Sequence, residues 1–164
     1  MYSLYNKEIF INKLNIFLIF VLLVLLDQTS KVMVTTFMIK NGLNNISIFP
    51  FFDLVFVRNT GISFGLFSEG GQFNRYFFSI LSISIGTLLI IFSFFAKKKV
   101  IIYAFTFTSA GAIGNASDRV YFGGVIDFID LFIYNMHWPA FNLADVFITI
   151  GVFFLLYESF SQKK

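Results

Sequence analysis

The chain has 164 residues, of which 57% are hydrophobic and only 13% are charged. Soluble domains carry about 25% charged residues, so this composition excludes an ordinary soluble enzyme and indicates an integral membrane protein of one domain, residues 1–164. The absence of cysteine excludes disulfides, thiolate catalysis and cysteine-ligated metals. The net charge of +3 is small, and the placement of the lysines fits membrane orientation rather than nucleic-acid binding.

Four apolar segments are long enough to be transmembrane helices, because about 20 helical residues cross a hydrocarbon core about 30 Å thick. The first segment lacks a small-residue cleavage site and continues into Asp27 and Lys31, so we interpret it as an anchor rather than a removed signal peptide. The predicted helices cover about residues 14–34, 76–96, 100–117 and 140–157.

The lysines predict the topology. Lys7 and Lys13 precede the first segment, three lysines at 97–99 separate the second from the third, and Lys163–Lys164 end the chain. With an even number of crossings, all of these lysines fall on one side of the membrane, which the positive-inside rule makes cytoplasmic. We therefore expect a multi-pass protein with both termini in the cytoplasm.

Two outer loops, at about residues 40–75 and 118–139, are too long for tight turns. Residues 46–49, 52–57 and 125–129 within them are rich in β-branched and aromatic side chains, which favour strands. The predicted fold is therefore an all-α membrane protein of four helices, with a small cradle-like β-sheet on its extracytoplasmic face beside the helix mouths.

Acidic residues within or beside the apolar segments are the candidates for chemistry. A charge at bilayer depth costs about 2.5–3.5 kcal/mol on insertion scales, so we expect a chain that keeps Asp27, Asp127 and Asp145 to use them. Asp118 and Asp130 map to the same outer end. Two close carboxyl groups do not both ionise readily, so one keeps a proton. Such a dyad activates a water on one acid and protonates the leaving amine from the other.

Chemistry alone leaves other interpretations open. Asp27 and Lys31 are four residues apart on one helix and can neutralise each other, while Asp118 beside Arg119 can form a structural ion pair. Buried carboxylates also serve small proton- or ion-coupled transporters, although those usually repeat their halves and this chain shows no repeat. A non-catalytic subunit of a membrane complex is a further alternative. The sole histidine, His137, is typical of a membrane-interface residue.

Four sequence patches carry a resemblance to a known family. Together, in this order and spacing over about residues 14–157, they resemble lipoprotein signal peptidase, the bacterial signal peptidase II, a family of membrane aspartyl endopeptidases. The patches are DQTSK at 27–31, RNTGISFG at 58–65, GNASDR at 114–119 with VIDF at 125–128, and PAFNLAD at 139–145.

The resemblance implies roles for eight residues. Asp127 and Asp145 match the two catalytic acids of the family, whereas Asp130 has no counterpart in its pattern. Six further residues match polar positions near the site, some of which support the dyad and the substrate. These six are Asn59, Asn115, Arg119, Asn142, Asp27 and Lys31.

Two departures from the family pattern lie beside these positions. Residues 62–63 are Ile-Ser where the family usually has Ala-Ala, and residues 116–117 are Ala-Ser where it has Leu-Ile. Neither departure replaces a proposed acid. We therefore expect them to change lipid or peptide preference rather than activity.

The resemblance implies an aspartyl endopeptidase that removes the signal peptide from a bacterial prolipoprotein whose lipobox cysteine carries diacylglyceryl. It would cut on the N-terminal side of that cysteine. The resemblance further implies an inner-membrane protein, monomeric and without metal or other cofactor, that contacts membrane lipid but not nucleic acid. We expect Asp127 and Asp145 to meet at the outer rim of the bundle and to hold one water.

Overall fold

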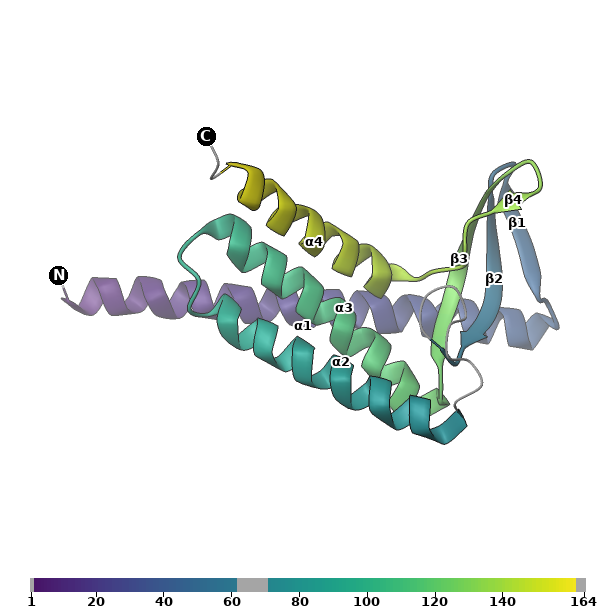
Figure 1. Cartoon of the computed structure of the whole chain (residues 1–164), viewed down its shortest axis with the longest axis horizontal. Coiled ribbons are helices and arrows are strands. Elements are labelled where there is room, and N and C mark those ends of the chain that lie inside the picture. Colours follow the sequence, from purple (N-terminus) through teal and green to yellow (C-terminus); the bar gives the residue numbers. More distant parts are fainter. Residues whose placement is uncertain (1, 62–70, 162–164) are drawn as a thin grey trace.

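The computed structural model describes residues 2–61 and 71–161 of the chain. Within these residues, four helices form a bundle and four strands form a sheet across one end of it (Figure 1). The predicted fold class is confirmed. The departure at residues 62–63 and the terminal Lys163–Lys164 lie outside the described residues. The helices are α1 (Tyr2–Asn41), α2 (Gly71–Ser93), α3 (Lys99–Phe122) and α4 (Leu143–Ser161).

Each of the four helices contains a span long and apolar enough to cross a membrane. Helix α3 is central, since α1, α2 and α4 all pack on it and half of its span is buried against 17–22% for the others. Small residues allow this close approach. A Cβ atom on Gly111 of α3 would overlap the carbonyl oxygen of Ala144, and one on Gly151 of α4 would overlap the hydroxyl of Thr108.

The sheet is antiparallel, with the strand order β1-β2-β3-β4. Strand β3 follows α3 almost directly, because Gly123 closes the helix in the left-handed region at a φ of 77°. The short connection ties the start of β3 to the end of the central helix. The strands are β1 (Asn45–Phe49), β2 (Phe52–Asn59), β3 (Val125–Ile133) and β4 (Met136–His137).

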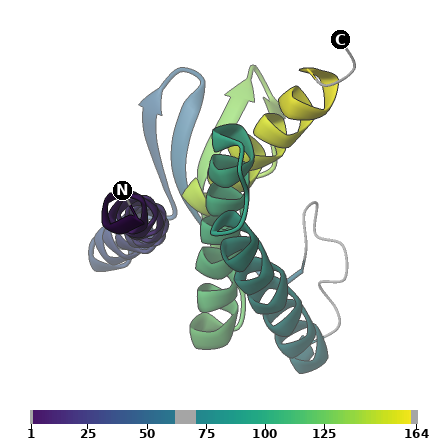
Figure 2. The same ribbon diagram turned by 90° about the vertical axis from the view of Figure 1, so that its left-hand side faces the viewer.

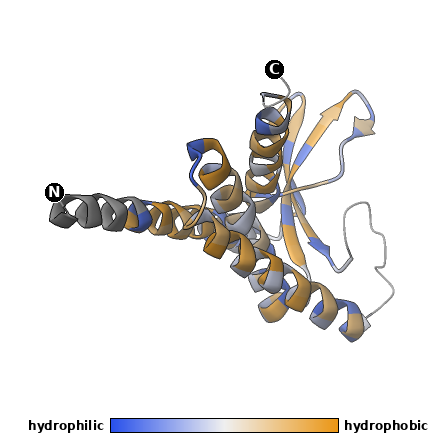
Figure 3. Cartoon of the chain, turned by 60° about the vertical axis from the view of Figure 1, so that its left-hand side comes forward, coloured by the Kyte–Doolittle hydropathy of each residue, from blue (hydrophilic) through white to orange (hydrophobic). Residues whose placement is uncertain are grey.

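Figure 2, seen from the end opposite the sheet, places α1 to one side of the other three helices, with the strands behind. Figure 3 shows hydrophobic residues along most of the length of the helices and a hydrophilic connection between α2 and α3 at the end away from the sheet. That connection contains Lys97 and Lys98, and Lys99 begins α3.

The helix ends differ from the predicted segments. Helix α1 continues to Asn41 instead of ending near residue 34, and α3 continues through residues 118–122, which were expected to form a loop. Helix α2 already begins at Gly71. An apolar run indicates the part of a helix that can cross lipid. The helix itself continues beyond that run as long as its backbone hydrogen bonds continue.

Helix α4 begins at Leu143 rather than at residue 140. Its start is set by Asn142, whose side-chain oxygen accepts the backbone N–H of Asp145 at 3.1 Å, in the manner of an N-cap residue. The preceding Phe141 instead pairs with Ile129 of β3 through its backbone. The chain therefore crosses from the sheet into α4 at the point where the second predicted acid lies.

Candidate active site

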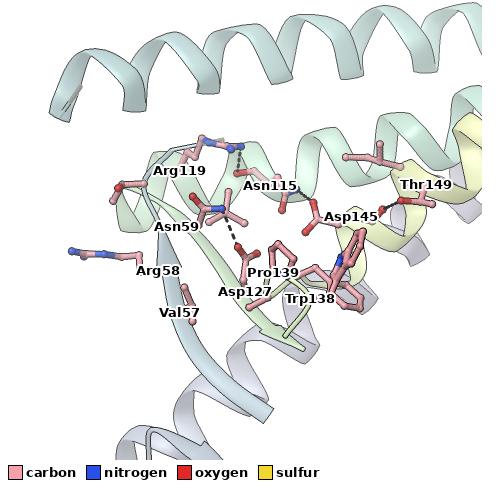
Figure 4. A pocket seen from close by; sticks show the side chains of 15 residues that line it. Val57, Arg58, Asn59, Asn115, Arg119, Asp127, Trp138, Pro139, Asp145 and Thr149 are labelled. Atoms are coloured by element: carbon pink, nitrogen blue, oxygen red, sulfur yellow. Dashed lines mark hydrogen bonds between the residues drawn. The ribbon is translucent and has the colours of Figure 1, made fainter. Parts of the chain in front are cut away.

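Asp127 and Asp145 line one cavity of about 830 Å³ between the sheet and the helices (Figure 4). Asp127 lies on β3 and is only 3% exposed, while Asp145 lies in the first turn of α4. Asn59, Asn115 and Arg119 line the same cavity. The fold thus brings five of the eight predicted site residues together from four elements.

Asn142 joins the two acids. Its side-chain nitrogen donates to Asp127 Oδ1 at 2.7 Å, and its backbone N–H donates to Asp145 Oδ2 at 3.2 Å. Asn142 is fully buried, so these contacts are shielded from water. One residue therefore orients both carboxyl groups.

Two further asparagines each hold one acid. Asn115 Nδ2 donates to Asp145 Oδ1 at 2.8 Å, and Asn59 Nδ2 donates to Asp127 Oδ2 at 3.2 Å (Figure 4). Asn59 is itself fixed, because its side-chain oxygen accepts the backbone N–H of Gly61. Every oxygen of the two carboxyl groups thus has an amide donor, which fixes the geometry of the pair.

Burial, as the largest cause, and the nearby charge of Asp145 together raise the pKa of Asp127 from its ordinary value of 3.8 to about 6. Hydrogen bonds from Asn59 and Asn142 and the charge of Lys31 oppose this rise. A carboxyl group with such a pKa keeps its proton to a higher pH than an ordinary aspartate does. The pair therefore has the chemical character of a dyad that shares one proton.

Arg119 supplies positive charge at the edge of the cavity. Its guanidinium lies within electrostatic reach of Asp145 and Asp127, and one of its nitrogens donates to Gly61 O at 3.3 Å. Its Nε is buried without a hydrogen-bond partner among the described residues. Because Arg119 also lines the cavity, its positive charge is suited to stabilise negative charge that develops on a substrate there.

Asp27 and Lys31 lie behind the dyad rather than in the cavity lining. They form the ion pair that their spacing predicted, with Lys31 Nζ 2.9 Å from Asp27 Oδ2. Both are nevertheless linked to the site, because Lys31 also donates to Asn115 Oδ1 at 3.1 Å. The pair can therefore neutralise its own charges, as the spacing predicted, and also contact the residues around Asp127 and Asp145.

Sequence reasoning assigned no role to Gln28 or Trp138, and gave Asp118 only a structural ion pair with Arg119. Among the described residues, the ion pair of Asp118 is with Lys31 instead, at 2.8 Å, and Gln28 donates to Asp118 Oδ1 at 3.1 Å. Trp138 lines the cavity. Asp118 and Gln28 both stand inside the quoted patches and Trp138 directly precedes one, so the patches contained the signal. The contacts themselves depend on helix packing.

His137 and Asp130 lie together away from the dyad. His137 Nδ1 is 2.8 Å from Asp130 Oδ2, and neither residue lines the cavity that Asp127 and Asp145 share. Asp130 is three positions beyond Asp127 on β3, and positions an odd number apart face opposite sides of a strand. The geometry therefore favours Asp127 over Asp130 as the partner of Asp145.

Comparisons with known proteins establish the family of the chain. A family model described as signal peptidase (SPase) II matches residues 19–161. The chain belongs to the signal peptidase II family. The lipoprotein signal peptidase of Thermodesulfovibrio yellowstonii is 38% identical over 141 residues, covering 86% of this chain and 91% of that protein. The lipoprotein signal peptidase of Aeromonas hydrophila is 38% identical over 149 residues, which cover 88% of this chain and 87% of that protein.

Solved structures support the same membership. One, described as a bacterial membrane enzyme at 2.3 Å resolution, has a TM-score of 0.70 and 33% identity over 92% of both chains. A second, at 1.9 Å resolution, has a TM-score of 0.67 and 32% identity over 88% of this chain and 91% of that one. This signal peptidase II is therefore a bacterial membrane protease of lipoprotein precursors. The resemblance predicted from the patches is confirmed, and the transporter alternative has no support.

Proposed function

We propose that this signal peptidase II is an aspartyl endopeptidase that acts on prolipoproteins whose lipobox cysteine carries diacylglyceryl. It cuts on the N-terminal side of that cysteine. The observation that supports this most is the pair of acids, Asp127 and Asp145, which share the buried Asn142 in one cavity. Apolar helix surface adjoins that cavity, which suits a substrate with acyl chains.

In the proposed reaction, a water lies between the two carboxyl groups. Asp145, whose two oxygens both accept hydrogen bonds, takes a proton from the water as its oxygen attacks the scissile carbonyl carbon. Asp127, with a pKa raised to about 6, donates its proton to the carbonyl oxygen. The C–N bond of the tetrahedral intermediate then breaks, and the leaving amine receives the proton that Asp145 had taken. At the same time one hydroxyl of the intermediate returns a proton to Asp127 as the new carboxyl group forms, so both acids regain their starting protonation.

Three polar residues support this chemistry in the proposal. Asn115 and Asn142 keep the dyad oriented, and Arg119 stabilises negative charge that develops on the carbonyl oxygen. Asn59 holds Asp127 from the sheet side. Neither a metal nor another cofactor takes part. The protein acts as a monomer, because one chain supplies both acids.

The proposed location is the bacterial inner membrane, with both termini in the cytoplasm. The lysines at 97–99 lie at the end of the bundle away from the sheet, and Lys13 lies near the start of the first span. The positive-inside rule makes that end cytoplasmic, so the sheet and the dyad lie near the extracytoplasmic face.

Purified protein in lipid vesicles is expected to cleave a diacylglyceryl-modified prolipoprotein and to leave the same precursor uncut when it lacks the lipid. The reason is that lipid tails among the helices bring the scissile bond to the dyad. A gel shift detects the released signal peptide, and mass spectrometry of the product locates the cut before the lipidated cysteine. Equal cleavage of both precursors would refute the lipid requirement, and cleavage of neither would refute the proposed activity.

A further inference from the structure

A buried charged cluster lies behind the dyad and contributes nothing to the cavity lining: Asp27, Lys31 and Asp118. Each of the three is at most 1% exposed. Lys31 Nζ lies 2.9 Å from Asp27 Oδ2 and 2.8 Å from Asp118 Oδ2, so one ammonium group bridges two carboxylates from α1 and α3. We call these three residues the bridge cluster.

Each carboxylate of the bridge cluster also holds the backbone directly before one acid of the dyad. Asp27 Oδ1 accepts the N–H of Ala144 at 2.9 Å, and Asp118 Oδ2 accepts the N–H of Ile126 at 3.1 Å. These two residues immediately precede Asp145 and Asp127 in the sequence. The cluster therefore binds the backbone at the start of α4 and at the start of β3, in each case one residue before an acid of the dyad.

A third link runs through Asn115. Lys31 Nζ donates to Asn115 Oδ1 at 3.1 Å, while Asn115 Nδ2 donates to Asp145 Oδ1 at 2.8 Å. The lysine thereby fixes which way the amide of Asn115 points. The stability of the fold does not by itself explain this cluster. Burying three charges has a desolvation cost, which apolar side chains packed in the same place would avoid.

We propose that Lys31 is a positioning residue, which holds the two acids of the dyad at their working separation through Asp27 and Asp118. This inference rests on the proposed function, since it concerns the same reaction. Lys31 touches neither the substrate cavity nor the two acids, so its effect is transmitted through the backbone of β3 and α4 and through Asn115.

Lys31 also acts on Asp127 through its charge, which lowers the pKa that burial and Asp145 raise. Removing this charge raises the pKa of Asp127, so Asp127 keeps its proton to a higher pH. The groups that face Asp127 come from every neighbouring element: Lys31 from α1, Asn59 from β2, Arg119 from α3, Asp145 from α4 and Asn142 before it.

The test compares Lys31→Met with the double variant Lys31→Met, Asp118→Asn. The bridge cluster carries a net charge of −1 in the wild type, −2 in the single variant and again −1 in the double variant. We expect kcat to fall on the order of 100-fold in both, with KM nearly unchanged, because a displacement of about 1 Å costs that much. In the single variant, the fall of kcat at alkaline pH should shift to a higher pH. In the double variant, it should return toward the pH at which the wild type loses activity.

Lys40→Met is the matched control, because Lys40 is an exposed lysine on the same helix. It should cleave like the wild type, and that activity shows that the proposed function holds whatever Lys31 does. A Lys31→Met variant with wild-type kcat, or full recovery of kcat in the double variant, would overturn the positioning role. If neither variant folds, Lys31→Arg replaces them, because arginine keeps the charge but changes the geometry. A wild-type kcat in Lys31→Arg would also overturn the positioning role of Lys31.

A second observation concerns the end of the sheet farthest from α3, which we call the sheet tip: residues 47–52 and 131–139. An apolar pocket there is lined by Phe51, Leu131, Ile133 and Met136 among others. Tyr134 is 90% exposed and Met136 is 74% exposed. The sheet tip contains no Asp, Glu, Lys or Arg.

The apolar residues at the end of β3 lie on the face of the sheet that carries Asp127. Asp127 faces the helix ends, where it meets Asn142, and alternation along β3 places Leu131 and Ile133 on that same face. Figure 1 shows β3 running across the bundle axis and past the start of α4. The residues near its end therefore extend beyond the start of α4, on the same face of the strand as Asp127.

We infer that the sheet tip inserts into the lipid headgroup region on its side of the membrane. The patch is continuous with the side of the protein that the apolar helices present to lipid, and its lack of charge selects a hydrophobic rather than an ionic partner. Trp and Tyr are enriched at this depth, because one end of each ring is apolar and the other polar.

Trp138 makes this testable, because it is the only tryptophan of the chain and lines the pocket at the sheet tip. In vesicles of neutral phosphatidylcholine, we expect lipid brominated near the headgroup to quench its fluorescence and aqueous iodide to quench it weakly. Ile133→Asp should reverse both effects. Strong iodide quenching without bromolipid quenching in the wild type would overturn the insertion. Loss of bromolipid quenching as protein density rises would instead assign the sheet tip to a second copy.

Discussion

Asp127→Asn and Asp145→Asn are each expected to abolish cleavage of a lipidated prolipoprotein, lowering kcat on the order of 1,000-fold or more. An asparagine in either position cannot exchange the proton that passes between the water, the substrate and the dyad. The amide has nearly the volume of the carboxyl group, so insertion and folding should persist. Single-turnover cleavage of a lipidated substrate, followed by gel shift, measures the loss.

Asp130→Asn is the matched control for the dyad. Asp130 lies on the same strand, but it pairs with His137 and does not line the cavity. We expect its kcat to stay within a few-fold of the wild type. Full activity in either dyad variant would end the proposed mechanism, and a loss in Asp130→Asn as deep as theirs would contradict the assignment of Asp127.

The second large effect is expected from Gly111→Ala. Its new Cβ would overlap the carbonyl oxygen of Ala144, a backbone atom in the first turn of α4 that has little freedom to move. Overpacking of this kind costs about 3 kcal/mol of unfolding free energy. The separation of α3 from α4 would also draw Asp145 away from Asn115, so kcat falls together with stability. Thermal unfolding in detergent and the cleavage assay measure the two effects.

Gly86→Ala on α2 provides the comparison. Its Cβ would lie 2.9 Å from Cγ1 and 3.0 Å from Cδ1 of Ile113, at the flexible end of a side chain that can adjust. We expect a smaller loss of thermal stability and little change in kcat, because α2 carries neither acid. Equal losses in the two variants would show that helix spacing around α3, rather than the contact with α4, controls the site.

The sequence predicted the four spans well, because membrane thickness sets a minimum length for an apolar helix and the chain has four such runs. The patches also predicted the pair of acids, Asp127 and Asp145, which the fold brings into one cavity. Sequence alone left the helix ends uncertain, since α1 and α3 continue beyond their apolar parts. Hydropathy indicates which part of a helix lies in lipid. It does not indicate the residue at which the backbone hydrogen bonding of the helix ends.

The side-chain contacts of the site required the tertiary structure. Spacing along α1 predicted the pair of Lys31 with Asp27, but the second partner, Asp118, comes from α3. No local pattern indicates that one lysine serves two helices, or that Asn142 reaches both acids. Such contacts depend on how closely small residues let α3 approach its neighbours.

Residue types and their order were therefore enough to establish a four-helix membrane protease of the signal peptidase II family, because bilayer thickness and short motifs are both local properties of a chain. Packing alone decided how its two acids are held. Asp127 sits on a strand and Asp145 on a helix, and only the folding of β3 and α4 against the central helix places both carboxyl groups around one asparagine.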